Sequence, residues 1–305
     1  MRPSIKGYLF ALLATISFSN VYIFSKAAMQ DVSLAQFGLL WFTLALLWNL
    51  LYAIRSKSIA SIRKFDKSTK LALAGIGVSE LIATSAFFTA INLMDNPAMV
   101  SFLANASPVF AALLGFLLLN ERFHLLETGG IIVTLLGMVI ITSHQAGGQF
   151  QFQLDSGTLA SLIFAFFYAV TTIIAKKRIG QIHPSLISLC RSIFLLIAFG
   201  LYFWFSKQTF AYTSHSLWNI GIGSLLGPFL GSVLTYVALK YIEATKTVVV
   251  ISTRSFFIIL GAFLYWGILP KQEQILGGVV TVLGILIITY GEWKKKKRPK
   301  KKKRP

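Results

Sequence analysis

The chain has 305 residues, of which 55% are hydrophobic and only 13% charged, and its formal net charge is +19. This composition leaves too little polar material to cover a soluble globule, so it predicts an integral membrane protein. The single cysteine, Cys190, excludes an internal disulfide framework, and the four histidines lie in or next to predicted loops rather than at paired ligand positions. We therefore expect no cofactor, no metal and no catalytic residue.

Apolar runs of roughly 20 residues, each long enough to cross the hydrocarbon core as a helix, recur along the whole chain. The first run is longer than the apolar part of a secretory signal, so we interpret it as a span. No soluble domain fits between the runs. The predicted spans lie near residues 7–29, 34–54, 71–94, 98–119, 125–143, 157–175, 186–205, 217–239, 247–269 and 274–291.

The positions of the cations predict the orientation, because positively charged loops resist translocation and stay in the cytoplasm. With the amino terminus inside, the predicted outer loops hold Lys207 and Lys271, whereas the inner loops hold clusters such as 55–70 and 176–178. The asymmetry persists when the carboxyl-terminal cations are left out. We therefore predict a multi-pass protein of the cell membrane, plasma or inner, with both termini cytoplasmic.

Residues 293–305 form a basic tail that follows the last predicted span directly. Such a tail attracts anionic lipids of the inner leaflet, at about 1 kcal/mol for each cation near the surface. A nucleic-acid partner is the weaker interpretation, since no interleaved aromatic residues or folded basic surface accompany the run. We expect the lipid bilayer, and no nucleic acid, as the partner of this tail.

The chain contains an internal repeat. Residues 130–142 read GIIVTLLGMVIIT and residues 277–289 read GGVVTVLGILIIT, while residues 7–26 align with residues 157–176 in the same order. Chance alignment of apolar residues explains one such block but not several in order. We therefore expect a first five-helix repeat at 1–144 and a second at 156–292.

An odd number of spans in each half requires the second half to enter the membrane in the opposite sense. The expected fold class is all-α integral membrane, with ten transmembrane helices as two inverted five-helix repeats. Inverted repeats place a central site at the interface of the halves, where rocking exposes it to one side and then the other. This arrangement favours a carrier of a small-molecule substrate over an enzyme.

Three short motifs occur in a specific order. AINLMDNPA precedes the fourth span, Pro108 is followed by LLGFLLLNE ending at Glu121, and HPSLISLCR opens the seventh span with Pro184 and Arg191. In order and spacing these motifs resemble those of the drug/metabolite transporter superfamily, in its EamA-type branch of ten-helix transporters. The resemblance covers nearly the whole chain and implies a transporter fold.

The second half departs from this pattern. Arg254 stands where the first half has Pro108, and Gly267 stands where it has Glu121. Trp41 occupies the first-half place of Arg191. These departures leave the fold expectation intact, but they prevent a substrate from being assigned by resemblance.

Charges within membrane spans are expensive, so they usually face a cavity or a partner. Glu80, Arg191 and Arg254 are such residues. One interpretation makes Arg254 a partner for an anionic substrate group and Glu80 a proton-coupling carboxylate. The other pairs Glu80 with an arginine as a structural ion pair, or lets Arg191 reach the inner headgroups. The sequence leaves both open.

Further polar or aromatic residues near mid-span are expected to bind substrate. Lys26 and Lys176 hold equivalent places in the two halves, and we expect both to reach toward the headgroups. Each polar group alone is weak evidence, since hydroxyls and amides also bond to neighbouring turns. The complete predicted substrate-binding set is Glu80, Arg254, Trp41, Asn105, Tyr236, Asn20, Tyr168 and Arg191.

Glycines in the fifth and tenth spans fall on one face of each helix, as Gly130 with Gly137 and Gly277 with Gly284. Small residues let helices approach closely, so we expect these spans to pack on neighbours or on a second subunit, leaving a homodimer possible. The leading hypothesis is a secondary transporter of a small polar or amphiphilic metabolite, driven by a gradient or by exchange. The alternative is a membrane-embedded enzyme acting on a lipid or isoprenoid substrate.

Overall fold

The computed structural model describes residues 3–94, 97–119, 125–143, 155–267 and 272–297. Glu121 and the part of the basic tail after Lys297 lie outside the described residues. The helices are α1 (Pro3–Ala28), α2 (Leu34–Arg55), η1 (Ile59–Lys64), α3 (Lys67–Leu93), α4 (Pro97–Ala104), α5 (Ser107–Leu119), α6 (Leu125–Ser143), α7 (Ser156–Arg178), α8 (Pro184–Phe205), α9 (Ser214–Ser224), η3 (Leu225–Gly231), α10 (Ser232–Tyr241), α11 (Ala244–Ser252), α12 (Arg254–Trp266) and α13 (Gln272–Lys297).

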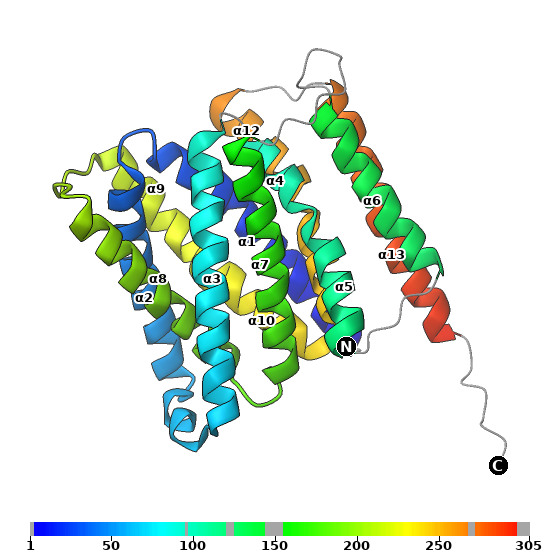
Figure 1. Ribbon diagram of the computed structural model, residues 1–305, viewed down its shortest axis with the longest axis horizontal. Helices are drawn as coiled ribbons and strands as arrows, with labels where there is room; N and C mark the ends of the chain where they lie inside the picture. The colour runs from blue at the N-terminus through cyan, green and yellow to red at the C-terminus, as the bar shows by residue number, and fades with distance from the viewer. Residues whose placement is uncertain (1–2, 95–96, 120–124, 144–154, 268–271, 298–305) are drawn as a thin grey trace.

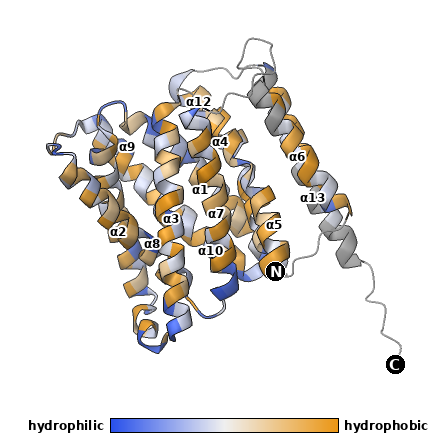
Figure 2. Cartoon of the chain, in the orientation of Figure 1, coloured by the Kyte–Doolittle hydropathy of each residue, from blue (hydrophilic) through white to orange (hydrophobic). Residues whose placement is uncertain are grey.

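The helices have the length and composition of membrane spans. Eight helical stretches among the described residues are long and apolar enough to cross a membrane, and two shorter apolar stretches lie in α6 and α13. Hydrophobic residues cover the sides of the bundle, while hydrophilic residues gather near the ends of several helices (Figure 2). The protein is therefore an all-helical, multi-pass membrane protein.

Exposed aromatic side chains gather where α8 ends and α9 begins. Trp204, Phe205, Phe210 and Trp218 are all highly exposed. Large amphipathic rings are enriched at the headgroup level of a bilayer. Their position is typical of residues at a membrane–water interface.

The most extensive helix contacts join α6 to α13, α3 to α7, α2 to α8 and α1 to α10. Each of these pairs combines one helix from residues 3–143 with one from residues 156–297. In Figure 1, α6 and α13 lie side by side at one edge of the bundle, and α1 begins at the same end at which α13 finishes. The first and second parts of the chain are thus packed against each other through four helix pairs.

The fourth and ninth predicted spans correspond to the apolar stretches Pro97–Leu119 and Ala244–Trp266, and each contains a short interruption of its α-helix. In the fourth span, Pro108 has no N–H to pair with the carbonyl of Ala104, and the hydroxyl of Ser107 donates to that carbonyl instead. In the ninth, the Thr253 hydroxyl donates to the Val250 carbonyl at 2.7 Å, at the junction of α11 and α12. At both breaks, backbone bonds of the i→i−3 type, such as Thr253 N–H to the Val250 carbonyl, accompany these side-chain bonds.

The two breaks are tied to each other by side chains. The hydroxyls of Ser101 on α4 and Ser255 on α12 are 2.7 Å apart. The amide of Asn105, just after α4, donates to the same Ser255 hydroxyl at 3.1 Å. These bonds connect the fourth span to the ninth inside the bundle.

The eighth predicted span contains the π-helical segment η3, which includes Pro228. The N–H of Ser232 donates to the carbonyls of Gly227 and Phe229 and passes over that of Pro228. The Pro228 carbonyl accepts instead from Asn49 on α2 at 3.1 Å and from Ser188 on α8 at 3.2 Å. Side chains of two neighbouring helices therefore bond to a carbonyl inside the irregular segment.

The prediction that glycine faces pack α6 and α13 is confirmed, since these faces meet each other. A Cβ added to Gly137 would lie 2.7 Å from the backbone nitrogen of Thr281 and 2.8 Å from the carbonyl oxygen of Gly277. Gly284 faces the backbone of Thr134 and Gly130 in the corresponding way. Side chains larger than hydrogen have no room at these crossing points.

Lys26 and Lys176 bind backbone carbonyls at helix ends, a role that the sequence analysis did not predict. The Nζ of Lys26 donates to the carbonyls of Ile91 and Met94, at 3.1 and 2.9 Å, where α3 ends. The Nζ of Lys176 donates to those of Leu239 and Ile242, at 2.6 and 2.7 Å, where α10 ends. The last carbonyls of a helix lack intrahelical donors and carry its negative dipole end, which is why a cation binds there.

Candidate functional site

A cavity lies in the middle of the bundle, between helices of the first and second parts of the chain. Its walls come from α1, α2, α3, α7, α8, η3, α10 and α12, while α4, α5, α6 and α13 contribute no lining residue. The lining residues are Phe18, Val21, Tyr22, Trp41, Phe42, Glu80, Thr84, Phe87, Phe88, Phe164, Tyr168, Thr171, Thr172, Arg191, Gly227, Pro228, Ser232, Thr235, Tyr236 and Arg254.

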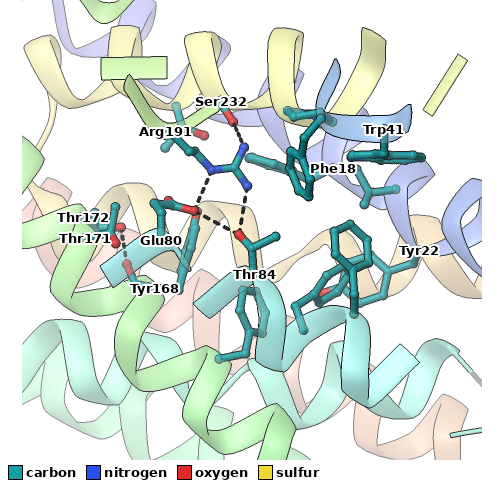
Figure 3. Close-up of a pocket in the computed structure, with 18 of the residues that line it drawn as sticks. Phe18, Tyr22, Trp41, Glu80, Thr84, Tyr168, Thr171, Thr172, Arg191 and Ser232 are labelled. Carbon is teal, nitrogen blue, oxygen red and sulfur yellow. Dashed lines mark hydrogen bonds and ion pairs between the residues drawn. The ribbon is translucent and has the colours of Figure 1, made fainter. Parts of the chain in front are cut away.

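Glu80 on α3 and Arg191 on α8 form a buried ion pair in the cavity wall. The Nε of Arg191 lies 2.6 Å from Oε2 of Glu80, and the Thr84 hydroxyl, one turn along α3, donates to the same oxygen at 3.2 Å. The guanidinium also donates to the hydroxyls of Ser232 on α10 and Thr84, at 3.0 and 3.2 Å (Figure 3). The structure shows Glu80 in an ion pair with Arg191, and a proton-coupling role of Glu80 stays a prediction.

The environment explains why this pair is stable. Two charges in the membrane interior each lose hydration, and the loss is compensated only when their remaining donors and acceptors also find partners. Here the hydroxyls of Thr84 and Ser232 accept further hydrogen bonds from the guanidinium of Arg191. These bonds join α3, α8 and α10. The pair therefore leaves no net charge from Glu80 and Arg191.

Arg254 is 3% exposed and has a different environment. Its guanidinium carbon lies 5.4 Å from the ring centroid of Tyr22, 5.6 Å from that of Phe164 and 5.8 Å from that of Tyr168. We refer to these three rings as the aromatic cage. Within the described residues, the Arg254 side chain forms no ion pair, and its buried Nε has no hydrogen-bond partner.

Three further buried polar atoms of the cavity lining lack a hydrogen-bond partner. They are the hydroxyls of Tyr22, Tyr168 and Thr171. Two of these hydroxyls belong to the aromatic cage itself. The region around Arg254 is therefore rich in donors that nothing within the described residues satisfies.

Most of the remaining wall is aromatic. Nine of the twenty lining residues are Phe, Tyr or Trp, including Trp41, Phe87 and Phe88. Trp41 lies with its ring 5.8 Å from that of Phe88, at 77°. This wall offers flat apolar surface next to a small number of polar groups, which is typical of a site for a small organic molecule.

Six of the eight predicted site residues line this cavity. Asn105 is fully buried outside it, where it binds Ser255, and Asn20 donates to the carbonyl of Ile16 at 2.8 Å on its own helix. The six lining residues are Glu80, Arg254, Trp41, Tyr236, Tyr168 and Arg191.

Sequence reasoning missed several lining residues, among them Thr84, Ser232 and the cage members Tyr22 and Phe164. Thr84 follows Glu80 by four residues, so its place on the same helix face was available as a signal. Tyr22 and Phe164 carried no such signal, since aromatic residues are frequent throughout the spans. Among the described residues, no group of three or more His, Cys, Asp or Glu side chains could hold a metal ion.

Comparison with known proteins identifies the family. The chain matches the EamA-like transporter family over residues 5–143 and again over residues 155–290. It belongs to that family. The two matches account for nearly all of the helical chain, and the EamA-like family is one of membrane transporters.

Full-length relatives are also named as transporters. An uncharacterized transporter of Clostridium kluyveri is 26% identical, covering 94% of this chain and 91% of its own. The uncharacterized transporter YoaV of Bacillus subtilis is 23% identical, covering 94% and 95%. A solved crystal structure of a protein 16% identical superposes with a TM-score of 0.76, over 98% of this chain and 100% of the other, so the two share a fold.

Proposed function

We propose that the protein is a secondary transporter that moves a small polar or amphiphilic metabolite across the cell membrane by alternating access. The observation that carries the proposal is the central cavity, in which a buried ion pair and the unpaired Arg254 lie among aromatic walls. Charges at this depth are costly unless they bind something. Membership of a transporter family supports the same conclusion.

We further propose ten transmembrane helices in two inverted five-helix repeats, 1–144 and 156–292, with both termini cytoplasmic. Reciprocal packing supports this division: α3 of the first part packs on α7 of the second, and α10 of the second packs on α1 of the first. The equivalent bonds of Lys26 and Lys176, each to a helix end within its own half, support it too. A two-fold relationship between the halves predicts both sets of contacts.

The parts that would move are the interrupted helices. The breaks before Ser107 and Arg254 and the π-helical segment at Pro228 reduce the number of regular backbone bonds that a bend must disrupt. The π-helical segment and the break before Arg254 lie in spans that line the cavity, and the break before Ser107 is bonded to the latter span through Ser101 and Asn105. In our proposal these spans bend as the site opens to one face of the membrane and then to the other.

Solute exchange in proteoliposomes tests the proposal. Vesicles containing the purified protein are preloaded with a mixture of amino acids, nucleosides, sugars and organic acids, and loss of each solute is followed by mass spectrometry. We expect protein-dependent release of a small subset, faster when a member of that subset is present outside. Release identical to that from protein-free vesicles for every solute would contradict the proposal.

The topology is tested separately. Tags at the two ends should be inaccessible from outside in intact cells or spheroplasts, and should become accessible when the membrane is permeabilised. Ends on opposite faces would contradict the inverted repeat and, with it, the proposed alternating-access mechanism.

A further inference from the structure

The charges that line the cavity do not cancel. The lining contains two guanidinium groups and one carboxylate, and the carboxylate of Glu80 is committed to Arg191 at 2.6 Å. One positive charge, that of Arg254, is left without a counter-charge among the described residues. An uncompensated charge in the membrane interior favours binding of an ion of opposite sign.

The rings around Arg254 attract its positive charge but accept no conventional hydrogen bonds from its N–H groups. Ring faces at 5.4 to 5.8 Å attract the guanidinium charge, but they supply no lone pair comparable to a carbonyl or carboxylate oxygen. The Nε is buried and unpaired, as are the hydroxyls of Tyr22 and Tyr168 on the same cage. A group of acceptor oxygens would satisfy these three donors together.

The number of charges in the cavity lining limits the net charge of the ligand. A single negative charge on the ligand neutralises the cavity, whereas a second would stay unpaired near the Glu80 carboxylate. Burying such a charge costs several kcal/mol. A cationic ligand would place two positive groups together in the same enclosure.

The aromatic wall indicates the shape and polarity of the uncharged part of the ligand. Trp41, Phe42, Phe87 and Phe88 extend the aromatic surface beyond the cage. Flat apolar groups pack on such rings by offset or edge-to-face contact, at about 0.5–1.5 kcal/mol per ring beyond the area buried. An ion that is small and fully hydrated would leave this surface uncovered.

From these observations, and building on the proposed transport function, we propose that the substrate is an organic monoanion with a flat apolar body. Its anionic oxygens bind Arg254 and the hydroxyls of Tyr22 and Tyr168. Its body lies against the aromatic wall. Arg254 is then the residue that selects the charge of the substrate, while the Glu80–Arg191 pair joins the helices that close around it.

Binding of a matched probe series to the purified full-length protein tests the proposal. The probes are phenylacetate, its neutral amide phenylacetamide, the dianion phenylmalonate, the cation phenethylammonium, and acetate, which lacks the ring. The readouts are the shift of the thermal unfolding midpoint and the change in tryptophan fluorescence that disappears in Trp41→Phe. We expect phenylacetate to bind at least about tenfold more tightly than the other four, as expected for loss of a charge-assisted bond or of the ring contacts.

Variants of Arg254 separate charge recognition from general damage. Arg254→Gln should lose the preference for phenylacetate over phenylacetamide, and Arg254→Lys should keep part of it. The exposed cation Lys177 supplies the matched control, since Lys177→Gln removes a positive charge outside the cavity and should bind all probes like the parent. Without ligand, Arg254→Gln should unfold at the same or a higher temperature, because it removes an uncompensated buried charge.

Several results would overturn the proposal. They are tighter binding of the neutral, dianionic or cationic probe, unchanged discrimination in Arg254→Gln, or no binding of any probe. A lower unfolding temperature of ligand-free Arg254→Gln would assign Arg254 a structural role instead. If the vesicle experiment detects exchange while phenylacetate fails to bind, the substrate class is wrong and the transport function stands; the reverse result rejects transport and keeps the anion site.

Discussion

Gly137 on α6 lies so close to Thr281 on α13 that a Cβ added to the glycine would be 2.5 Å from the threonine Oγ1. The nearby atoms also include backbone, which cannot move aside without shifting a helix. The corresponding contact in the opposite direction lies between Gly284 on α13 and Thr134 on α6. These four residues make α6 and α13 a closely packed pair.

Gly137→Ala should therefore destabilise the protein, even though alanine is the better helix former by about 1 kcal/mol. Overpacking of a filled interface typically costs about 1–3 kcal/mol, which exceeds that gain. Thermal unfolding in detergent measures the change. Gly129→Ala, on the same helix but with nothing within 4 Å of the added Cβ, should unfold at or above the parental midpoint, and equal loss in both variants would refute the packing argument.

The ion pair between Glu80 and Arg191 predicts a non-additive mutant cycle. Glu80→Gln and Arg191→Gln each leave a polar or charged partner buried without compensation, which costs about 3–5 kcal/mol when such a pair is broken. The double variant removes both charges, so its loss should be clearly smaller than the sum of the single losses. Unfolding midpoints of the four proteins give the coupling. Strict additivity would show that the two side chains do not interact in the membrane.

Glu80→Gln also tests proton coupling. If Glu80 alternately binds a proton and Arg191 during transport, the variant should lose uptake driven by a proton gradient while exchange of solute for solute survives. Uptake into proteoliposomes with and without an imposed pH gradient distinguishes the two activities. A variant that retains the full response to the gradient would leave Glu80 with a purely structural role.

Lys176→Met should destabilise the end of α10, because the variant removes the donor that Leu239 and Ile242 share. An unsatisfied buried acceptor costs about 1–3 kcal/mol, and the half-buried position places the expected loss at the lower end. The neighbouring Lys177 is exposed, so Lys177→Met serves as a control of equal size and charge change. Equal midpoints for the two variants would contradict a role for Lys176 in capping the helix.

Acid should weaken the contact between the α1–α2 loop and the start of α9. Hydrogen bonds to Oδ2 of Asp31 from Thr213, at 2.7 Å, and then from His215 lower the pKa of this carboxyl below its ordinary value of 3.8. A lowered folded-state pKa contributes stability above the unfolded value, and this contribution disappears as the pH falls through the folded value. Below about pH 5, the unfolding midpoint should therefore fall less in Asp31→Asn than in the parent. Parallel profiles would reject this linkage.

The spans could be predicted from the sequence because the bilayer imposes a length and a polarity that any apolar run reveals. The glycine faces of α6 and α13 could be predicted for a similar reason, since Gly130 and Gly137 fall on one face of any α-helix. The break before Arg254 could not be predicted, because no proline marks it. Threonine occurs in regular helices as well, so the bond of Thr253 to the Val250 carbonyl could not be inferred from the sequence. Helix boundaries therefore followed from composition, but interruptions did not.

Partners within the site were only partly predictable. The sequence did not distinguish which of the two arginines pairs with Glu80; in the structure α8 packs on α3 and brings Arg191 to Glu80. Asn105 illustrates the opposite error: a mid-span amide can bond to a neighbouring helix rather than line a cavity, and here its Nδ2 donates to Ser255. Hydropathy reports depth in the membrane, but it does not report the direction in which a side chain points.

The π-helical turn at Pro228 determines which side chains of α10 face inward. A π-helical turn contains one more residue than an α-helical turn, and one residue corresponds to about 100° of rotation. Deleting a single residue from Leu225–Gly231 would turn every following side chain by that angle. Ser232 would no longer bond to Arg191, and Tyr236 would no longer line the cavity. The one additional residue thus sets the angular register of the whole second portion of this span.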